Sequence, residues 1–119
     1  EYNGSLTPAL KNALDWASRR EGDEPALAAY AGKTAAIIAA SPGRLGGARS
    51  LMALRHVLSA LGVHVMPQQL ALAEARDAFD ESGELADSAH AATLAGIAQA
   101  LVRTTARLTV ESDQPNYPL

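Results

Sequence analysis

The sequence predicts an α/β protein built on a parallel sheet, and three consecutive segments carry that prediction. Thr34–Ala40 is a continuous apolar run without alternation, which suits a strand buried on both faces of a parallel sheet. Four leucines then recur at helical spacing before Gly62, which ends the pattern: Leu51, Leu54, Leu58 and Leu61. Residues 63–66 follow as a short strand that we expect to end at Pro67. Strand, helix and strand in this order predict a βαβ unit with a right-handed crossover.

A first helix is predicted near the start of the chain. Thr7 and Pro8 form a helix-start signal, because a hydroxyl side chain can cap the helix and proline is tolerated at the first helical position. Apolar residues at helical spacing continue this helix to about Arg20. Polar turn residues at 21–25 then predict a surface loop.

The last third of the chain predicts irregular structure followed by a long helix. Residues 71–79 are expected to hold a helical turn, and residues 80–83 form a turn cluster. The helix runs from about residue 87 to residue 108, and its apolar face is expected to be buried: Leu94, Ile97, Ala98, Leu101, Val102 and Leu108. We assign residues 1–110 to part of a single domain and residues 111–119 to a flexible tail.

Composition excludes several classes of function. The 119 residues suffice for one domain, and 48% hydrophobic with 19% charged residues excludes general disorder. A net charge of −3 without a basic block argues against nucleic acid as a partner, and no apolar stretch could span a membrane. No cysteine is present, which removes disulfides and thiolate chemistry, and the histidines lack metal-ligand spacing. We therefore expect a soluble protein, and we expect it in the cytoplasm.

Two strands are too few for an independent core. A parallel pair must be covered on both faces, and the strand that contains Ile37 and Ile38 would keep at least one open, apolar edge. Such an edge is a site for further strands. Because the chain also starts at Glu1, inside loop-like sequence, we expect it to be incomplete at its N-terminal side.

Two glycine-containing loops are the candidate binding site. Residues 1–8 and 41–48 each precede a helix, and loops at the carboxyl ends of strands line the ligand crevice of open α/β sheets. Asn3 and Gly4 tolerate positive φ and can bring bare backbone up to a flat ligand. The same is expected of the second loop's glycines, Gly43, Gly46 and Gly47. The competing interpretation is that both loops are only tight turns.

Residues 1–18 resemble the NADPH-dependent FMN reductase family. Members of this flavodoxin-like family, which contains quinone, azo-dye and chromate reductases, carry a Glu-Tyr-Asn-Gly-Ser loop that leads into a helix with an Asn-x-x-Asp-Trp signature. Here the loop begins at Glu1 and the signature runs from Asn12 to Trp16. Further matches at residues 32–33, 40–49 and 79–83 follow in the same order. The resemblance therefore covers roughly residues 1–108.

The resemblance implies a fold, a cofactor and a set of binding residues. The fold is a flavodoxin-like doubly wound parallel sheet, of which this chain would hold the C-terminal portion. FMN would lie against eight residues of the two loops: Glu1, Tyr2, Asn3, Gly4, Ser5, Ser41, Pro42 and Gly43. Backbone groups of Tyr2, Asn3 and Gly4 would face the polar edge of its ring. Neither a catalytic side chain nor a metal is implied. The family's phosphate-binding loop is not in this sequence, so the chain alone should bind FMN poorly, and we expect that the N-terminal part was omitted or cleaved.

The implied activity is a ping-pong reaction. NADPH would deliver hydride to FMN, and electrons would pass to quinones, azo compounds, flavins or metal oxyanions, in a homodimer or homotetramer. Trp16 suits core packing or a subunit contact, whereas Arg44 and Arg49 suit an NADPH phosphate, a neighbouring subunit or plain solvent exposure. One alternative is a non-catalytic fragment that completes its sheet with another chain. A one-electron carrier is less favoured, because the net charge of −3 is mild.

Overall fold

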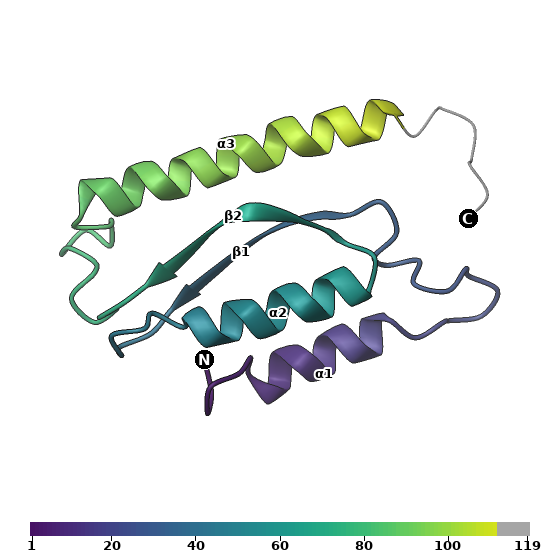
Figure 1. Cartoon of the computed structure of the whole chain (residues 1–119), viewed down its shortest axis with the longest axis horizontal. Helices are drawn as coiled ribbons and strands as arrows, with labels where there is room; N and C mark the ends of the chain where they lie inside the picture. The colour runs from purple at the N-terminus through teal and green to yellow at the C-terminus, as the bar shows by residue number, and fades with distance from the viewer. Residues whose placement is uncertain (112–119) are drawn as a thin grey trace.

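The computed structural model describes residues 1–111 and confirms the α/β class. Five elements follow one another along the chain (Figure 1): α1 Pro8–Ala17, β1 Thr34–Ala40, α2 Ala48–Ala60, β2 His64–Leu72 and α3 Ser88–Glu111. The tail predicted at 111–119 lies outside the described residues, except for Glu111, which ends α3. None of the helices within residues 1–111 is long and apolar enough to cross a membrane.

The two strands pair in parallel around α2, as the βαβ prediction requires. Pairing runs from Thr34 opposite His64 to Ala40 opposite Leu72. The prediction that the second strand ends at Pro67 is wrong, because β2 continues to Leu72. Between the second and third pairs of the register, β1 advances from 35 to 37 while β2 advances from 65 to 69, so Pro67 falls in an irregular stretch. A bulge tolerates proline because its missing N–H is not needed for the ladder there.

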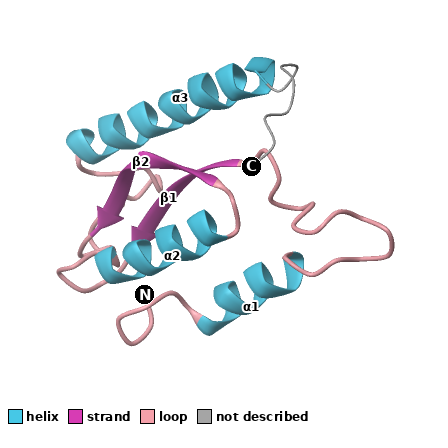
Figure 2. Cartoon of the chain, turned by 45° about the vertical axis from the view of Figure 1, so that its right-hand side comes forward, coloured by secondary structure: helices cyan, strands magenta, loops and turns pink. Residues whose placement is uncertain are grey.

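The sheet lies between helices on both sides. Figure 2 shows the strands with α3 on one side, and with α2 and α1 on the other. The core forms on the α2 side, where residues of β1, α2, the turn before β2 and the loop before β1 pack together: Tyr30, Ile37, Leu51, Leu58 and Val63. Leu51 is 1% exposed, which confirms the leucine stripe of α2 as its buried face.

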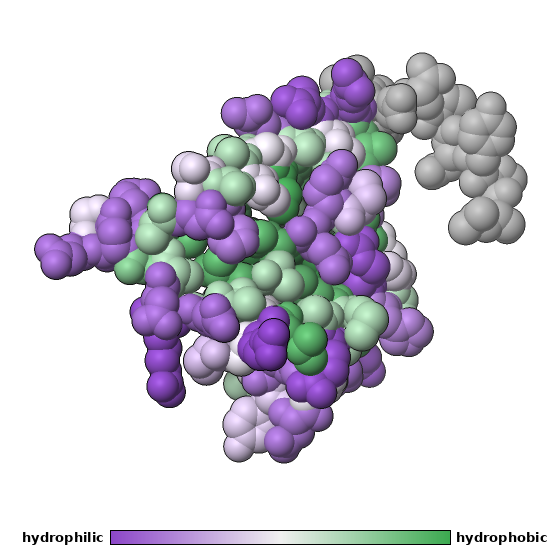
Figure 3. Space-filling view, turned by 60° about the vertical axis from the view of Figure 1, so that its left-hand side comes forward, coloured by the Kyte–Doolittle hydropathy of each residue, from purple (hydrophilic) through white to green (hydrophobic). Residues whose placement is uncertain are grey.

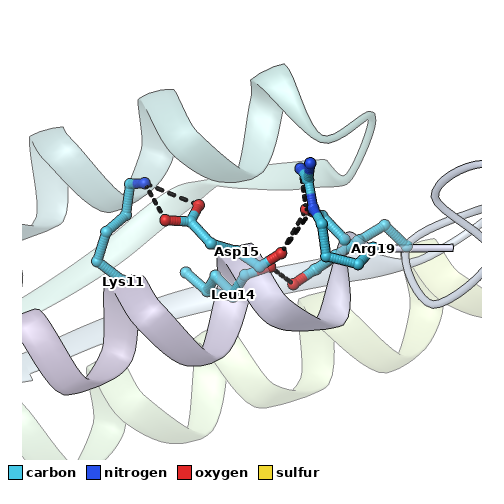
Figure 4. A network of polar contacts seen from close by, with 6 residues as sticks. Lys11, Leu14, Asp15 and Arg19 are labelled. Carbon is cyan, nitrogen blue, oxygen red and sulfur yellow. Dashed lines mark hydrogen bonds and ion pairs between the residues drawn. The ribbon is translucent and has the colours of Figure 1, made fainter.

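Local side-chain contacts fix α1. Thr7 caps the helix as predicted, because its Oγ1 accepts a hydrogen bond from the Leu10 N–H at 3.3 Å. The helix ends at Ala17 rather than near Arg20, since the N–H of Ser18 turns back to the carbonyls of the last turn. Figure 4 shows the contacts along this helix, including the ion pair of Lys11 with Asp15. The Tyr30 hydroxyl donates to the Leu14 carbonyl at 2.7 Å and so ties α1 to the chain that follows.

The helix α3 is less buried than its periodicity predicts. Ile97 is buried, and Leu94 and Leu101 are half-buried. The prediction of burial is wrong for three residues, which are exposed: Ala98, Val102 and Leu108. A 24-residue helix extends about 36 Å, whereas the surface beneath it is only two strands wide within the described chain.

The segment between β2 and α3 is held by turns. The helical turn predicted at 71–79 is wrong, because Ala71 and Leu72 belong to β2 and the residues after them form bends and turns. The turn cluster at 80–83 is confirmed: the Asp80 carboxylate accepts hydrogen bonds from the N–H groups of Ser82 and Glu84. These bonds, with that of the Ser82 hydroxyl as the largest contribution, lower the pKa of Asp80.

One edge of β1 has no neighbouring strand in the described chain. The sheet has two strands, so each strand pairs along one side only. Ile37 is buried, whereas Ile38 is 48% exposed, so the expectation of burial on both faces is wrong for Ile38. The open apolar edge expected from the strand count is therefore observed.

Candidate functional site

The two candidate loops lie at the same end of the molecule. The first loop (residues 1–7) leads into α1, and the second loop (residues 41–47) connects the end of β1 to α2. Figure 1 shows the N-terminus beside the start of α2. Three hydrogen bonds from Arg49 and Ser50 to the Glu1 carboxylate join the first loop to the start of α2, across 48 and 49 positions of sequence.

The first loop contains a tight turn. The N–H of Tyr2 donates to the Ser5 carbonyl at 2.9 Å, and the N–H of Ser5 donates back to the Tyr2 carbonyl at 3.1 Å. Asn3 and Gly4 between them have φ of 49° and 81°, as in the type I′ turn that favours Asn-Gly. Their two N–H groups have no acceptor within residues 1–111, so they are the donors that this turn leaves for a ligand.

Hydrogen bonds hold the second loop against the chain that follows β2. The N–H of Ser41 donates to the Leu72 carbonyl at 3.0 Å, and the Ser41 carbonyl accepts from the Ala75 N–H at 3.0 Å. The Ser41 hydroxyl accepts from the Gly43 N–H at 3.2 Å. Pro42, between them, has no N–H to offer. The loop is therefore preshaped by the chain itself.

Two glycines of the second loop serve internal packing. A Cβ at Gly46 would lie 2.7 Å from the backbone of Ala71 and of Ala73, and a Cβ at Gly47 would lie 2.7 Å from the Ala39 Cβ. The expectation that these two glycines offer backbone to a ligand is therefore wrong. Gly43 differs, because the nearest atom to its Cβ position is the Ser41 hydroxyl at 3.6 Å.

Glu1 carries the strongest polar contacts of the site. Its Oε2 accepts from the N–H groups of Arg49 at 3.1 Å and Ser50 at 3.3 Å, and its Oε1 accepts from Arg49 Nε at 2.7 Å. The hydrogen bond from the Arg49 side chain is the main reason why the pKa of Glu1 is lowered. Sequence reasoning grouped Glu1 with the cofactor residues and left Arg49 to a phosphate, a subunit or solvent. It missed the pairing of Glu1 with Arg49. The one signal of this pairing in the sequence is that the first turn of α2 contains no acidic residue.

Two hollows meet at the last residues of β1. A cleft of about 150 Å³ between α1, α2 and β1 is lined by Glu1, Leu6, Thr7, Leu10, Ile38, Ala39, Ala40, Ser50, Leu51 and Leu54. An apolar hollow of about 300 Å³ on the α3 side shares its β1 residues: Ile38, Ala39, Ala40, Leu70, Leu72, Phe79, Leu85 and Leu94. Figure 3 shows that hydrophobic side chains gather at the centre of this end of the molecule.

The chemistry of this site is that of binding. Its walls are mostly apolar side chains with the hydroxyl residues Thr7 and Ser50, and its one carboxylate, that of Glu1, is already paired with Arg49. Residues 1–111 contain no group of three or more His, Cys, Asp or Glu side chains that could hold a metal ion. Mostly apolar hollows with a few polar groups suit a largely apolar ligand that carries some polar atoms.

Comparison with known proteins gives consistent matches. A family model described as NADPH-dependent FMN reductase matches residues 1–77. An NAD(P)H-dependent FMN reductase of Pseudomonas aeruginosa is 44% identical over 88 residues, which are 73% of this chain and 45% of that protein. A quinone reductase of Pseudomonas putida is 39% identical over 88 residues, which again are 73% of this chain and 45% of that protein. An NADPH:quinone oxidoreductase of Arabidopsis thaliana is 36% identical over 91% of this chain and 53% of its own length. The chain thus spans about half the length of these relatives.

Proposed function

Because the chain belongs to the NADPH-dependent FMN reductase family, we propose that it is part of an FMN-dependent oxidoreductase. NADPH is the proposed hydride donor, and quinones are the proposed acceptors, since the similar bacterial and plant proteins are named quinone reductases and a quinone oxidoreductase. Azo dyes, free flavins and chromate are further candidate acceptors from the family resemblance. Donor and acceptor would use the same opening in turn.

The two loops fit the isoalloxazine ring of FMN. The observation that carries the proposal is the Asn3 and Gly4 turn, whose N–H groups have no acceptor in the described part of the chain and lie on a loop bound to the start of α2. These donors suit the polar edge of the ring, and the preshaped bend at Ser41, Pro42 and Gly43 suits its face. When bound, FMN supplies the hydride chemistry, so the protein contributes placement and hydrogen bonds.

Arg44 is the residue that we propose for a phosphate of NADPH. Both arginines of the second loop region were candidates, but Arg49 is paired with Glu1. Arg44 is exposed in the second loop, and no hydrogen bond or ion pair of its side chain occurs in the described part of the chain. Arg44→Gln should therefore raise the KM for NADPH, while the KM for the quinone stays unchanged.

Flavin binding and turnover test the proposal directly. The protein, expressed from its complete reading frame, should be yellow, should quench FMN fluorescence on reconstitution, and should oxidise NADPH when a benzoquinone is added. Parallel lines in double-reciprocal plots at several quinone concentrations would indicate ping-pong turnover. A colourless protein that neither binds FMN nor oxidises NADPH contradicts the proposal.

We also propose a homodimer or homotetramer in the cytoplasm, where NADPH would be at hand. Support for self-association comes from α1, whose outer face forms a hollow of about 440 Å³ lined by Pro8, Lys11, Asn12, Asp15, Trp16 and Arg19. Trp16 is 73% exposed there, and large exposed aromatic side chains are enriched at interfaces. Light scattering should report a mass of more than one protomer. Trp16→Ser should lower this mass, whereas Val102→Ser on α3 should leave it unchanged. Cell fractionation tests the compartment.

A second candidate function is that of an assembly piece without catalysis. The open edge of β1 and the exposed Ile38 favour it, because an apolar strand edge can accept a further strand. Intact mass and N-terminal sequencing of the protein isolated from its source distinguish the two. A mass near 12.4 kDa with Glu1 at the amino terminus supports the assembly piece; a larger mass supports the oxidoreductase.

A further inference from the structure

We propose that Glu1 and Arg49 are positioning residues that lock the Asn3 and Gly4 turn to the start of α2, and so set the geometry of the FMN site. Glu1 was predicted among the residues against which FMN would lie, whereas the inference here gives its side chain an indirect role, through Arg49 and the start of α2. The inference rests on the proposed function, but the lock itself is a property of the chain that can be measured without flavin.

The helix α2 begins without a cap of its own. Gly47 occupies the N-cap position with φ of 86° and makes no side-chain hydrogen bond, and the first turn contains no acidic residue. The first N–H groups of a helix need acceptors, and a carboxylate is favoured there by the helix dipole. The Glu1 carboxylate meets both needs from 48 positions away, since its Oε2 accepts from the N–H groups of Arg49 and Ser50.

The Arg49 side chain joins this carboxylate to the turn. Its Nε donates to Glu1 Oε1 at 2.7 Å, and its terminal nitrogen completes an ion pair with the same oxygen. The guanidinium carbon and one terminal nitrogen lie 3.7 Å from the Cβ position of Gly4. The planar guanidinium therefore lies beside the turn while its nitrogens hold the carboxylate, an arrangement that lysine cannot reproduce.

Within the first loop, Glu1 is a structural anchor, whereas the Asn3 and Gly4 turn offers donors to a ligand. The Glu1 side chain is 9% exposed and fully engaged, whereas that of Arg49 is 54% exposed. Hydrogen bonds from Arg49 keep the pKa of Glu1 low, so the carboxylate is charged at neutral pH. The donors left for a ligand are the N–H groups of Asn3 and Gly4. Because these groups can only be as well placed as the turn that carries them, the lock determines where they point.

The test uses Glu1→Gln and Arg49→Lys in the protein expressed from its complete reading frame. Glu1→Gln keeps the size of the side chain but directs an amide donor at the guanidinium or at the helix. Asp87→Asn is the matched control, because Asp87 also places a carboxylate at the start of a helix, and its side chain contacts His90 and Ala89 of α3 rather than either loop. Two measurements are made on each protein: the FMN dissociation constant by fluorescence quenching, and amide exchange and chemical shifts by NMR without flavin.

Glu1→Gln should weaken FMN binding by about tenfold or more, since small misplacements of binding groups are costly. In the flavin-free protein, the amides of Arg49 and Ser50 should exchange faster and the Asn3 and Gly4 resonances should shift, while the amide of Leu58 in the same helix keeps its protection. Arg49→Lys should give an intermediate loss of affinity, and Asp87→Asn none. If the wild type binds FMN and Glu1→Gln binds it equally tightly, the positioning role of Glu1 is wrong and the proposed function still stands. Failure of the wild type to bind FMN overturns the proposed function, and the exchange data then still decide whether the lock exists.

Discussion

Replacing Gly46 by alanine tests how the second loop is built. Gly46 has φ of 58°, and a Cβ there would lie 2.7 to 2.8 Å from backbone atoms of Ala71 and Ala73. Gly62, just after α2, also has positive φ, 79°, but no atom lies within 4 Å of its Cβ position. The two glycines therefore share the conformational cost and differ in the steric one, which makes Gly62→Ala the matched control.

The expected magnitudes follow from these two terms. A left-handed conformation costs a non-glycine residue about 1–2 kcal/mol, which both variants should show. Overpacking against a well-packed neighbour costs about 1–3 kcal/mol more, and only Gly46→Ala incurs it. Since the atoms in the way are backbone, they cannot move aside by a rotamer change. Gly46→Ala should thus reduce the free energy of unfolding by about 2–5 kcal/mol, a large part of the stability of a typical domain.

Urea unfolding followed by far-UV circular dichroism measures the difference. Trp16 is too exposed to report on this loop by fluorescence. With an m-value of about 2 kcal/mol per molar urea, the midpoint of Gly46→Ala should lie about 1 M below that of Gly62→Ala. Equal midpoints for the two variants would refute the reasoning, because they would mean that the second loop does not pack on the end of β2 as described.

Three further outcomes are expected. Leu51→Ala should destabilise the protein by about 3–5 kcal/mol in urea unfolding, because it leaves a cavity at a fully buried position. Met52 is exposed, so Met52→Ala should change the free energy of unfolding by less than about 0.5 kcal/mol. Thr7→Ala should cost about 1 kcal/mol by loss of the α1 cap, and Thr7→Ser should retain most of it; equal losses would contradict the cap. Because folding lowers the pKa of Asp80, its charged form stabilises the protein above the unfolded pKa, and this contribution disappears as the pH falls through the folded pKa. Asp80→Asn should therefore lower the melting temperature at pH 7 and converge with the wild type in strong acid.

The elements that sequence predicted well are those whose signals lie within the element itself. Thr7 marks the start of α1, the apolar run marks β1, and the leucine stripe marks the buried face of α2. The length of β2 was missed because Pro67 normally ends a strand, and only the register against β1 reveals the bulge that accommodates it. The number of buried residues on the apolar face of α3 was overestimated, because periodicity shows that a helix is amphipathic without showing what covers its apolar face.

For the site, the rule that loops gather at the carboxyl ends of parallel strands placed both loops at one end of the sheet. It could not supply the contact that ties the first loop to α2, since nothing in the local sequence of Glu1 indicates Arg49 as its partner. The available hint was indirect: α2 begins after Gly47 with no acidic residue in its first turn, so its N–H groups need an acceptor from elsewhere. Such a requirement names the chemistry of the missing partner but not its position in the chain.

The glycines of the two loops show why composition alone could not separate architecture from binding. Gly46 and Gly47 are needed because β2 and β1 approach too closely for any side chain, so their role would remain if no ligand ever bound. Gly43 has ordinary free space around its Cβ position, and Gly4 has a guanidinium 3.7 Å from its own. Packing of the chain does not require a bare backbone at Gly43, so close approach of a ligand to this glycine stays a prediction.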